Sequence, residues 1–365
     1  MISKISIKNF KALKDTTIEV KPLNVLMGLN GMGKSSFIQS ILLLRQSDNI
    51  ITGNLNLNGN YIEIGKGRDA MYQYSTEESI TFSFEFLDKE ELSWTFKYNP
   101  DSNYLIATNE LQITDFSQYS IFNSNFQYLS AERTGPKTDY QTSSWDVISQ
   151  RQIGIDGKFA IHYLNVYGNE RIQQNNLKHP KAKSDILIHQ VDAWLGEITP
   201  GVKLNTTEIP GTDKVLLDYQ FETGSLYTNR FRPKNVGFGL SYVLPVIVAL
   251  LTVKNDKLII IENPESHIHP KGQSELGKLI ALASNAGMQC IVETHSDHII
   301  NGIRVAVKEG LISKDDVNIS YFERITSNDE QYAKATRIRV DESGELSEYP
   351  KHFLDEWNNQ LLKLI

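Results

Sequence analysis

Alternating apolar and polar positions predict strands in the first third of the chain. A period of two runs through residues 80–86, and it returns at 94–98 with Trp94, Phe96 and Tyr98 on the apolar positions. We therefore expect antiparallel β structure across residues 50–113, with one face buried. Aromatic residues at this spacing are typical of a sheet core, which we favour over a platform for a nucleotide base.

Two other patterns complete the prediction of the elements. Continuous apolar runs are typical of buried parallel strands, whereas apolar residues recurring every three or four positions predict helices. Further strands are predicted at 5–7, 18–20, 24–27, 257–262, 289–292, 317–322 and 335–340, with shorter ones within 201–234. Helices are predicted at about 33–47, 156–168, 184–197 and 237–247, after 270, and from about 352. The fold class is therefore α/β, with a mixed central sheet, an antiparallel β subdomain and a helical insertion.

Composition narrows the class of protein. The chain has 365 residues, of which 40% are hydrophobic and 22% charged, as expected of a soluble globular protein with one elaborated domain or two. No run of 18 apolar residues is present, so we expect no membrane helix. The N-terminus has the pattern of a strand and not of a signal peptide. A single cysteine, Cys290, excludes a disulfide framework and favours a cytoplasmic location.

Net charge bears on nucleic-acid binding. The formal charge is −7, which argues against a globally basic nucleic-acid binder. A polar linker at 173–183 carries three lysines and His179, which could contact nucleic acid. A solvated loop is the better interpretation of this segment.

The strongest motif lies at residues 28–35, which match G-x-x-x-x-G-K-[ST] between an apolar strand and an apolar helix. Glycines at 28, 31 and 33 permit positive φ angles and bring backbone N–H groups close to phosphate oxygens. Lys34 supplies charge for the β- and γ-phosphates, and Ser35 can place its hydroxyl on Mg²⁺. The residues expected to hold the nucleotide here are Asn30, Gly31, Met32, Gly33, Lys34, Ser35 and Ser36.

Three later segments carry further candidate chemistry. Four apolar residues end in Glu262, which is the pattern of a central strand that delivers an acid to Mg²⁺. His295 stands at the tip of the next buried strand, where it could read a γ-phosphate. Gly237, Gly239 and Ser241 open an apolar helix and form a second N-terminus suited to an anion.

Other polar residues leave more than one interpretation open. Four histidines lie close in sequence, and we favour capping and hydrogen bonding around a nucleotide over a zinc site, because no cysteine or matched spacing completes one. Arg133, at a strand end before Gly135 and Pro136, is a candidate phosphate-sensing or interface residue, or else a surface arginine. Gln127 as a ligand of metal-bound water is not favoured. The histidines are His267, His269, His295 and His298.

Taken in order, four elements match one family: the loop 28–35, the segment 237–241, the strand end 262–265 and the strand end 294–296. On these motifs the chain resembles an ABC-class ATPase head of the RecF/SMC/OLD (overcoming lysogenization defect) type. It is similar to compact bacterial AAA-type ATPases often associated with phage-defence loci. The similarity covers most of the chain, and the combination is much more specific than any one motif.

The resemblance implies a role for each matched residue. Lys34 and Ser35 would hold phosphate and Mg²⁺, Glu262 would stand in place of the Walker B acid, and His295 would be the switch histidine. Gly237, Gly239 and Ser241 match the signature segment, which in this family contacts the γ-phosphate of the opposite protomer. Two ATP molecules would then lie between the heads of a homodimer, or of a higher oligomer.

One departure from the family concerns the general base. Asn263 occupies the position where the family usually has a glutamate, and an amide can orient a water molecule but cannot take its proton. Glu265 follows Pro264 and could turn into the site to serve instead. We therefore expect slow hydrolysis, with Lys34, Glu262, Asn263, Glu265 and His295 as the catalytic set.

A second departure concerns the C-terminal segment. Larger OLD-type proteins carry a Toprim nuclease domain, but the acids near this C-terminus lack its strand-Asp-x-Asp pattern, and residues 317–365 show no obvious chemistry. A separately encoded nuclease or other effector is therefore the expected partner. The acids concerned are Asp315, Asp316, Asp341 and Glu342.

The expected function is ATP-driven dimerisation of heads that controls an effector or a DNA-bound complex, in phage defence and away from membranes. The alternatives are a nucleotide-gated scaffold that sequesters an effector with little hydrolysis, and a RecF-like DNA-repair ATPase. An ABC transporter subunit is disfavoured by the signature and by the long insertion. One ATPase domain is expected over 1–365, made of strands and P-loop at 1–50, a β subdomain at 51–135, a helical and β insertion at 136–234, signature, Walker B and switch elements at 235–312, and a tail at 313–365.

Overall fold

The structure is a computed structural model that describes residues 1–47, 53–87, 91–109, 115–253, 256–327, 329–350, 353–354 and 356–364. The chain forms two compact units. Unit 1 comprises residues 1–123, 315–341 and 345–365, and unit 2 comprises residues 124–314 and 342–344. The prediction that all segments act as a single ATPase domain stays a prediction.

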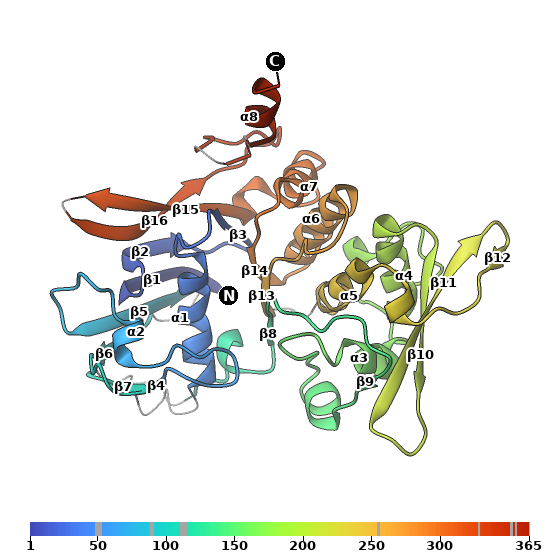
Figure 1. The fold of residues 1–365 in the computed structure, drawn as a ribbon, viewed down its shortest axis with the longest axis horizontal. Helices are drawn as coiled ribbons and strands as arrows, with labels where there is room; N and C mark the ends of the chain where they lie inside the picture. Colours follow the sequence, from blue (N-terminus) through green and yellow to red (C-terminus); the bar gives the residue numbers. More distant parts are fainter. Residues whose placement is uncertain are drawn as a thin grey trace. The chain divides into compact units, whose positions relative to one another are not determined.

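Unit 1 is built mainly of strands (Figure 1). Its elements are β1 Ile2–Phe10, β2 Leu13–Glu19, β3 Leu23–Gly28, α1 Lys34–Gln46, β4 Asn54–Asn56, α2 Gly67–Ala70, β5 Ser79–Phe86, β6 Leu92–Lys97, β7 Tyr104–Ala107, β15 Val317–Ser327, β16 Glu330–Ile338 and α8 Glu356–Leu362. One sheet has the strand order β2-β1-β5-β6-β7-β4. The predicted antiparallel β structure at 50–113 is thereby confirmed for the described residues, whereas residues 50–52, 88–90 and 110–113 lie outside them.

The aromatic stripe of this sheet is core, as predicted. Phe82 lies 5.8 Å from Phe96 and Phe84 lies 6.3 Å from Trp94, measured between ring centroids. All four side chains are at most 1% exposed. Because their rings pack edge-on against one another, none of them presents a face to a nucleotide base.

A second group of strands in unit 1 supports the phosphate loop. β3 runs parallel to β15, with Gly28 opposite Phe322, and β15 pairs antiparallel with β16. The described residues of β3 from Leu23 to Met27 are buried, which fits the continuous apolar run in the sequence. The predicted helix at 33–47 is confirmed as α1, whose apolar face is buried.

Unit 2 combines helices with two small groups of strands. Its elements are β8 Phe126–Leu129, β9 Tyr140–Gln141, α3 Ala160–Tyr167, α4 Leu187–Ile198, β10 Val202–Glu208, β11 Lys214–Thr223, β12 Leu226–Tyr227, α5 Phe238–Leu251, β13 Leu258–Glu262, α6 Pro270–Asn285, β14 Gln289–Glu293 and α7 Asp297–Lys308. β8 and β14 both pair parallel with β13, and β10 pairs antiparallel with β11. α6 and α7 pack side by side (Figure 1).

The sequence placed these elements well and their ends less well. α3 is shorter than the predicted 156–168, and α4 begins three residues after the predicted start at 184. β16 begins at Glu330 instead of 335, because pairing with β15 extends it beyond the apolar run. The predicted start of the last helix, residue 352, lies outside the described residues, and α8 begins at Glu356.

Candidate functional site

The backbone of the phosphate loop has the conformation that its glycines predict. Gly28, Gly31 and Gly33 have φ angles of 134°, 75° and 103°. A Cβ atom on Gly28 would lie 2.2 Å from the carbonyl oxygen of Phe322, so no other residue fits there. The loop therefore depends on glycine twice, for its φ angles and for the close approach of β15.

The N-terminus of α1 is arranged as an anion site would be. Gly33 is its N-cap, no side chain caps it, and no acidic residue stands in its first turn. The helix dipole therefore points an uncompensated positive end toward the loop. Ser35 is exposed, whereas Ser36 is only 9% exposed, which favours Ser35 as the residue that reaches a metal ion.

Lys34 is folded along the loop. Its side chain is 3% exposed, and its Nζ donates hydrogen bonds to the carbonyl oxygens of Gly28 at 2.8 Å and Leu29 at 3.0 Å. Burying an ammonium costs free energy unless its donors are used, so these carbonyls hold the charge at the loop.

A cavity of about 360 Å³ adjoins the loop within unit 1. Gly31 and Met32 line it, and Arg324 donates from Nη2 to the carbonyl oxygen of Gly31 at 3.2 Å. The other charged or aromatic lining residues are Lys11, Arg68, Tyr72 and Tyr332. Sequence reasoning missed these residues, and β15, in the segment where it expected no obvious chemistry, brings Arg324 to the loop.

Two carboxylates end adjacent strands of unit 2. Glu262 closes β13 and Glu293 closes β14, and the parallel register sets them opposite each other. Glu293 is only 6% exposed. The Tyr128 hydroxyl donates to Glu262 Oε1 at 3.1 Å, and burial raises the pKa of the Glu262 carboxyl. Sequence reasoning assigned no role to Glu293, although its position at a strand end, like that of Glu262, was the available signal.

Arg133 is not on the surface. It is 4% exposed, and burial lowers the pKa of its guanidinium to about 10. Its donors reach the backbone carbonyl oxygens of Tyr242, Ser130, Glu262 and Asn263. The surface-arginine interpretation is therefore wrong, and four backbone partners leave little of the fork for a phosphate.

Glu265 is hydrogen-bonded to the two residues directly after β14, Thr294 and His295, which we call the switch segment. Its Oε2 accepts a hydrogen bond from Thr294 Oγ1 at 2.8 Å, and its Oε1 accepts one from the backbone N–H of His295 at 2.9 Å. Both carboxylate oxygens are therefore engaged with the residues that end β14. Its role as a general base stays a prediction, and a structural role in holding His295 is equally well founded.

The signature segment divides into an exposed and a buried part. Gly237 is exposed, and a Cβ atom there would meet nothing within 4 Å. A Cβ atom on Gly239 would lie 2.2 Å from the carbonyl oxygen of His267, so this glycine lets α5 pack on the loop after β13. Ser241 is 5% exposed, and its hydroxyl faces the buried hydroxyl groups of Tyr140 and Tyr219. Its contact with a second copy stays a prediction, and its burial makes Gly237 the better candidate.

The histidines fit local structural roles. His269 caps α6, because its Nδ1 accepts from the backbone N–H of Lys271 at 3.3 Å. His267 packs edge-on against Phe238 and Tyr242, at 5.0 and 4.7 Å between ring centroids. In the described part of the chain, no three His, Cys, Asp or Glu residues gather as metal ligands would.

Two other candidates are used up in internal contacts. Gln127 is 3% exposed, and its amide bonds the backbone of Tyr128 and Gly154. In the polar linker, Lys178 pairs with Asp185 and Lys181 pairs with Glu197, each at 2.7 Å. These pairs favour the solvated-loop interpretation over a nucleic-acid contact.

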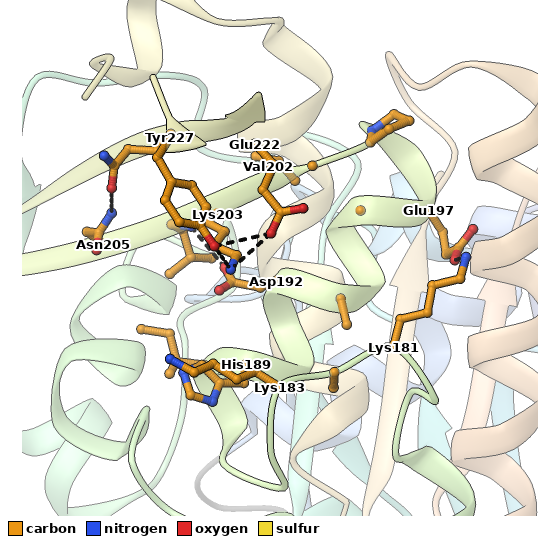
Figure 2. A pocket seen from close by; sticks show the side chains of 18 residues that line it. Lys181, Lys183, His189, Asp192, Glu197, Val202, Lys203, Asn205, Glu222 and Tyr227 are labelled. Carbon is orange, nitrogen blue, oxygen red and sulfur yellow. Dashed lines mark hydrogen bonds and ion pairs between the residues drawn. The ribbon is translucent and has the colours of Figure 1, made fainter. Parts of the chain in front are cut away.

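A larger cavity, of about 670 Å³, lies between α4 and β10 in unit 2. Figure 2 shows Lys203 beside Glu222 and Tyr227 on one side and Asp192 projecting from α4. Burial raises the pKa of Asp192 to about 7. None of the predicted site residues lines this cavity.

The sequence predicts that both groups of residues meet at one nucleotide. Lys34 and Ser35 belong to unit 1, whereas Glu262, Glu265 and His295 belong to unit 2. Their joint action on one nucleotide therefore stays a prediction.

A protein family described as "AAA domain, putative AbiEii toxin, Type IV TA system" matches residues 23–301, from the strand before the phosphate loop to α7. The chain belongs to this family. A second family, described as a protein of unknown function (DUF3696), matches residues 312–364. No curated protein matches the chain.

Solved structures agree with the family on the fold. The chain is similar to the SmcHead bound to the C-winged helix domain of ScpA, with 15% identity, a TM-score of 0.56, and coverage of 93% of this chain and 98% of that one. It is also similar to the Smc head domain with an extended coiled coil bound to the C-terminal domain of ScpA from Pyrococcus furiosus, with 13% identity, a TM-score of 0.52, and coverage of 100% and 99%.

The predicted P-loop fold of ABC/SMC-head type is thereby confirmed, and residues 23–301 form the AAA domain of the matched family. Across the described residues, every helix is too short or too polar to cross a bilayer.

Proposed function

We propose that this protein binds ATP with Mg²⁺ and hydrolyses it slowly, and that two copies close on the nucleotide to control a separate effector. The observation that carries the proposal is the phosphate loop, with its three positive φ angles and the uncapped start of α1. Such a loop binds the β- and γ-phosphates through backbone N–H groups, with Lys34 as the neighbouring charge. The cavity beside Gly31 and Met32 is the candidate place for the nucleoside.

The donor set suits Mg²⁺. Ser35 offers an exposed hydroxyl directly after Lys34, and Glu262 offers a carboxylate whose pKa burial raises. Hard oxygen ligands of this kind are what Mg²⁺ prefers, and a divalent cation offsets the cost of keeping a buried carboxylate ionised. If Ser35 and Glu262 hold Mg²⁺ together, charge on the transferred phosphoryl group would be neutralised there. Asn263 orients the attacking water, and His295 senses the γ-phosphate.

The role of a second copy rests on Gly237. Nothing in the described chain requires glycine at this exposed position, because its φ is −56° and a Cβ atom would meet open space. Gly237 is the N-cap of α5, a position that glycine shares with several other favoured residues, and its lack of a side chain leaves room for a close approach from outside the chain. An apolar cavity of about 490 Å³ beside Gly237 and Gly239 widens the surface that a second copy would cover.

A second candidate function is a nucleotide-gated scaffold that holds an effector and turns over little ATP. Asn263 favours it, because an amide cannot accept the proton of the attacking water. The two hydrogen bonds that Glu265 accepts from Thr294 and His295 favour it as well, because they hold the carboxylate toward the end of β14 and make it a weaker proton acceptor. With either function, we propose that the protein acts in phage defence and that DNA is a further ligand.

Phosphate release and ATP binding by the purified protein separate these candidates. Turnover that depends on Mg²⁺, and that Lys34→Ala and Glu262→Gln each reduce by about 100-fold or more, supports the ATPase. Tight ATP binding and ATP-dependent dimer mass without turnover support the scaffold. Absence of ATP binding by the wild-type protein contradicts both. DNA binding that falls steeply with salt would point to the DNA-bound complex.

A further inference from the structure

Arg133 is a buried cation that is satisfied by backbone groups. It comes four residues after β8 and bonds carbonyl oxygens from three segments of unit 2. The distances are 2.9 Å to Ser130 and 2.7 Å to Glu262 from Nη1, and 3.1 Å to Tyr242 from Nε. A buried charge without hydrogen-bond partners is strongly unfavourable, so the fold must place these carbonyl oxygens around the guanidinium.

The first segment that Arg133 holds is the peptide after β13. Asn263 has a φ angle of 44°, a left-handed conformation that most residues with a side chain avoid and that asparagine adopts more readily than the others. Its carbonyl oxygen accepts from Arg133 Nη2 and from Ser266 Oγ at 3.0 Å, and its N–H donates to the carbonyl oxygen of Glu293 at 2.8 Å. Strain of this kind persists only where surrounding bonds over-determine it.

The second segment is the start of α5. Arg133 bonds Tyr242 in the second turn of this helix, and its guanidinium lies 5.8 Å from the centre of the Tyr242 ring. The same ring packs on Phe238, with 4.8 Å between centroids. The contacts of Arg133 therefore extend through Tyr242 to the first residue of α5, next to Gly237. Arg133 is thus in direct contact with the start of α5.

A third contact extends the chain of bonds to the switch segment. Glu265 follows Asn263 by two residues and holds the N–H of His295. Gly239 packs against the carbonyl oxygen of His267 in the same loop. The exposed start of α5, Asn263 and His295 are thus connected by packed groups and hydrogen bonds within one unit.

We propose that Arg133 is a positioning residue that couples the start of α5 to Asn263 and His295, so that engagement of Gly237 by a second copy sets the hydrolysis geometry. The inference rests on the proposed function and deepens it. In this proposal, turnover depends on dimerisation because Arg133 contacts the backbone carbonyl oxygens of both segments. A contact between Arg133 and a phosphate would not produce that dependence.

The test compares Arg133→Lys with Arg151→Lys. Lysine keeps the charge but cannot serve four carbonyls in a planar fork. Arg151 is a matched control in unit 2, because its partners are the side chains of Glu170 and Tyr167. Steady-state turnover is measured against ATP and against protein concentration, together with ATP-driven dimer mass and Tm.

The expected result for Arg133→Lys is a KM within about twofold of wild type, a kcat lower by about 20-fold or more, and a turnover that no longer rises with protein concentration. Arg151→Lys should match wild type in all three. A kcat for Arg133→Lys within about threefold of wild type overturns the coupling while leaving the ATPase function intact. Wild-type protein that fails to bind ATP overturns the proposed function itself.

A merely structural role would lower Tm and the active fraction without changing the concentration dependence per active site. If the lysine variant does not fold, hydrogen exchange on the wild-type protein decides. Residues 238–242, 263–266 and 295 should gain protection together when ATP is added. Protection confined to the phosphate loop would contradict the coupling.

Discussion

The phosphate loop and the loop after β13 reach left-handed backbone in different ways. In the phosphate loop, Gly28, Gly31 and Gly33 supply the positive φ angles. In the loop after β13, Asn263 and His267 do so, at 44° and 65°, although neither is glycine. Both loops follow a buried parallel strand, so the difference lies in what holds the backbone and not in the place of the loop in the fold.

The difference teaches how each loop is specified. Glycine takes positive φ at little cost, so the phosphate loop needs no hydrogen bonds to offset strain in its backbone. A side chain in the same conformation costs about 1 kcal/mol or more, which hydrogen bonds from Arg133 and Ser266 offset at Asn263. The first loop is therefore built by its own sequence, and the second by residues far from it.

The largest effect is expected at Gly28. Alanine at this position would force its Cβ to 2.2 Å from the backbone of Phe322 and would hold a side chain at a φ of 134°. Gly28→Ala should lower the free energy of unfolding by about 3 kcal/mol or more, measured by urea denaturation. A folded variant whose free energy of unfolding lies within about 1 kcal/mol of wild type would show that β15 can move away from residue 28. Glycine would then not be required in the phosphate loop, and the contrast between the two loops would not hold.

A smaller effect, on activity alone, is expected at Gly237. Alanine has room there and an ordinary φ, so Gly237→Ala should leave Tm within about 2 °C of wild type. Turnover and ATP-driven dimer mass should nevertheless fall, by about tenfold for turnover, because the methyl group blocks a close approach. Equal loss of stability and turnover would assign Gly237 to the fold instead.

The conformation of Asn263 gives a third measurement, on stability. Asn263→Ala should cost about 1 kcal/mol, since asparagine tolerates left-handed backbone better than alanine. Asn263→Gly should be nearly neutral, because glycine removes the strain while adding freedom to the unfolded chain. Chemical denaturation of the two variants beside wild type checks the order, and alanine at least as stable as glycine would contradict a supported left-handed residue.

The smallest effect on turnover is expected at Asp192, in the cavity of Figure 2. Its pKa is about 7 in the folded protein and about 3.9 in an unfolded chain, so between these values only the folded state keeps the proton. Its contribution to stability is therefore lost as pH rises from about 4 to about 7. Asp192→Asn should flatten this slope and leave turnover unchanged, as thermal melts across pH and a phosphate assay would show.

The sequence predicted the parts of the molecule whose signals are local. The loop around Lys34, the buried strands and the amphipathic helices follow from motif and periodicity within a few residues. Arg133 contacts Tyr242, which lies 109 positions later in the sequence, and no local sequence pattern around either residue predicts this contact. Arg324 faces the phosphate loop only because β15 pairs with β3, and this pairing joins segments from opposite ends of the chain.

Helix α5 shows a second limit of local patterns. From Gly239 to Leu251 all its side chains except that of Tyr242 are buried, so its sequence has no polar face that tells inside from outside. The sequence therefore placed Ser241 with Gly237 and Gly239 in one contact surface, whereas Ser241 is directed inward. A helix that is apolar all round can be predicted as an element but not oriented.

Arg133 recognises main-chain oxygen atoms, and every amino acid supplies the same one. The four hydrogen bonds therefore do not depend on which side chains stand at these positions, although the φ angle of Asn263 and the ring of Tyr242 restrict the choice at two of them. An exchange at position 263 therefore tests the backbone conformation of that residue and not its hydrogen bond to Arg133.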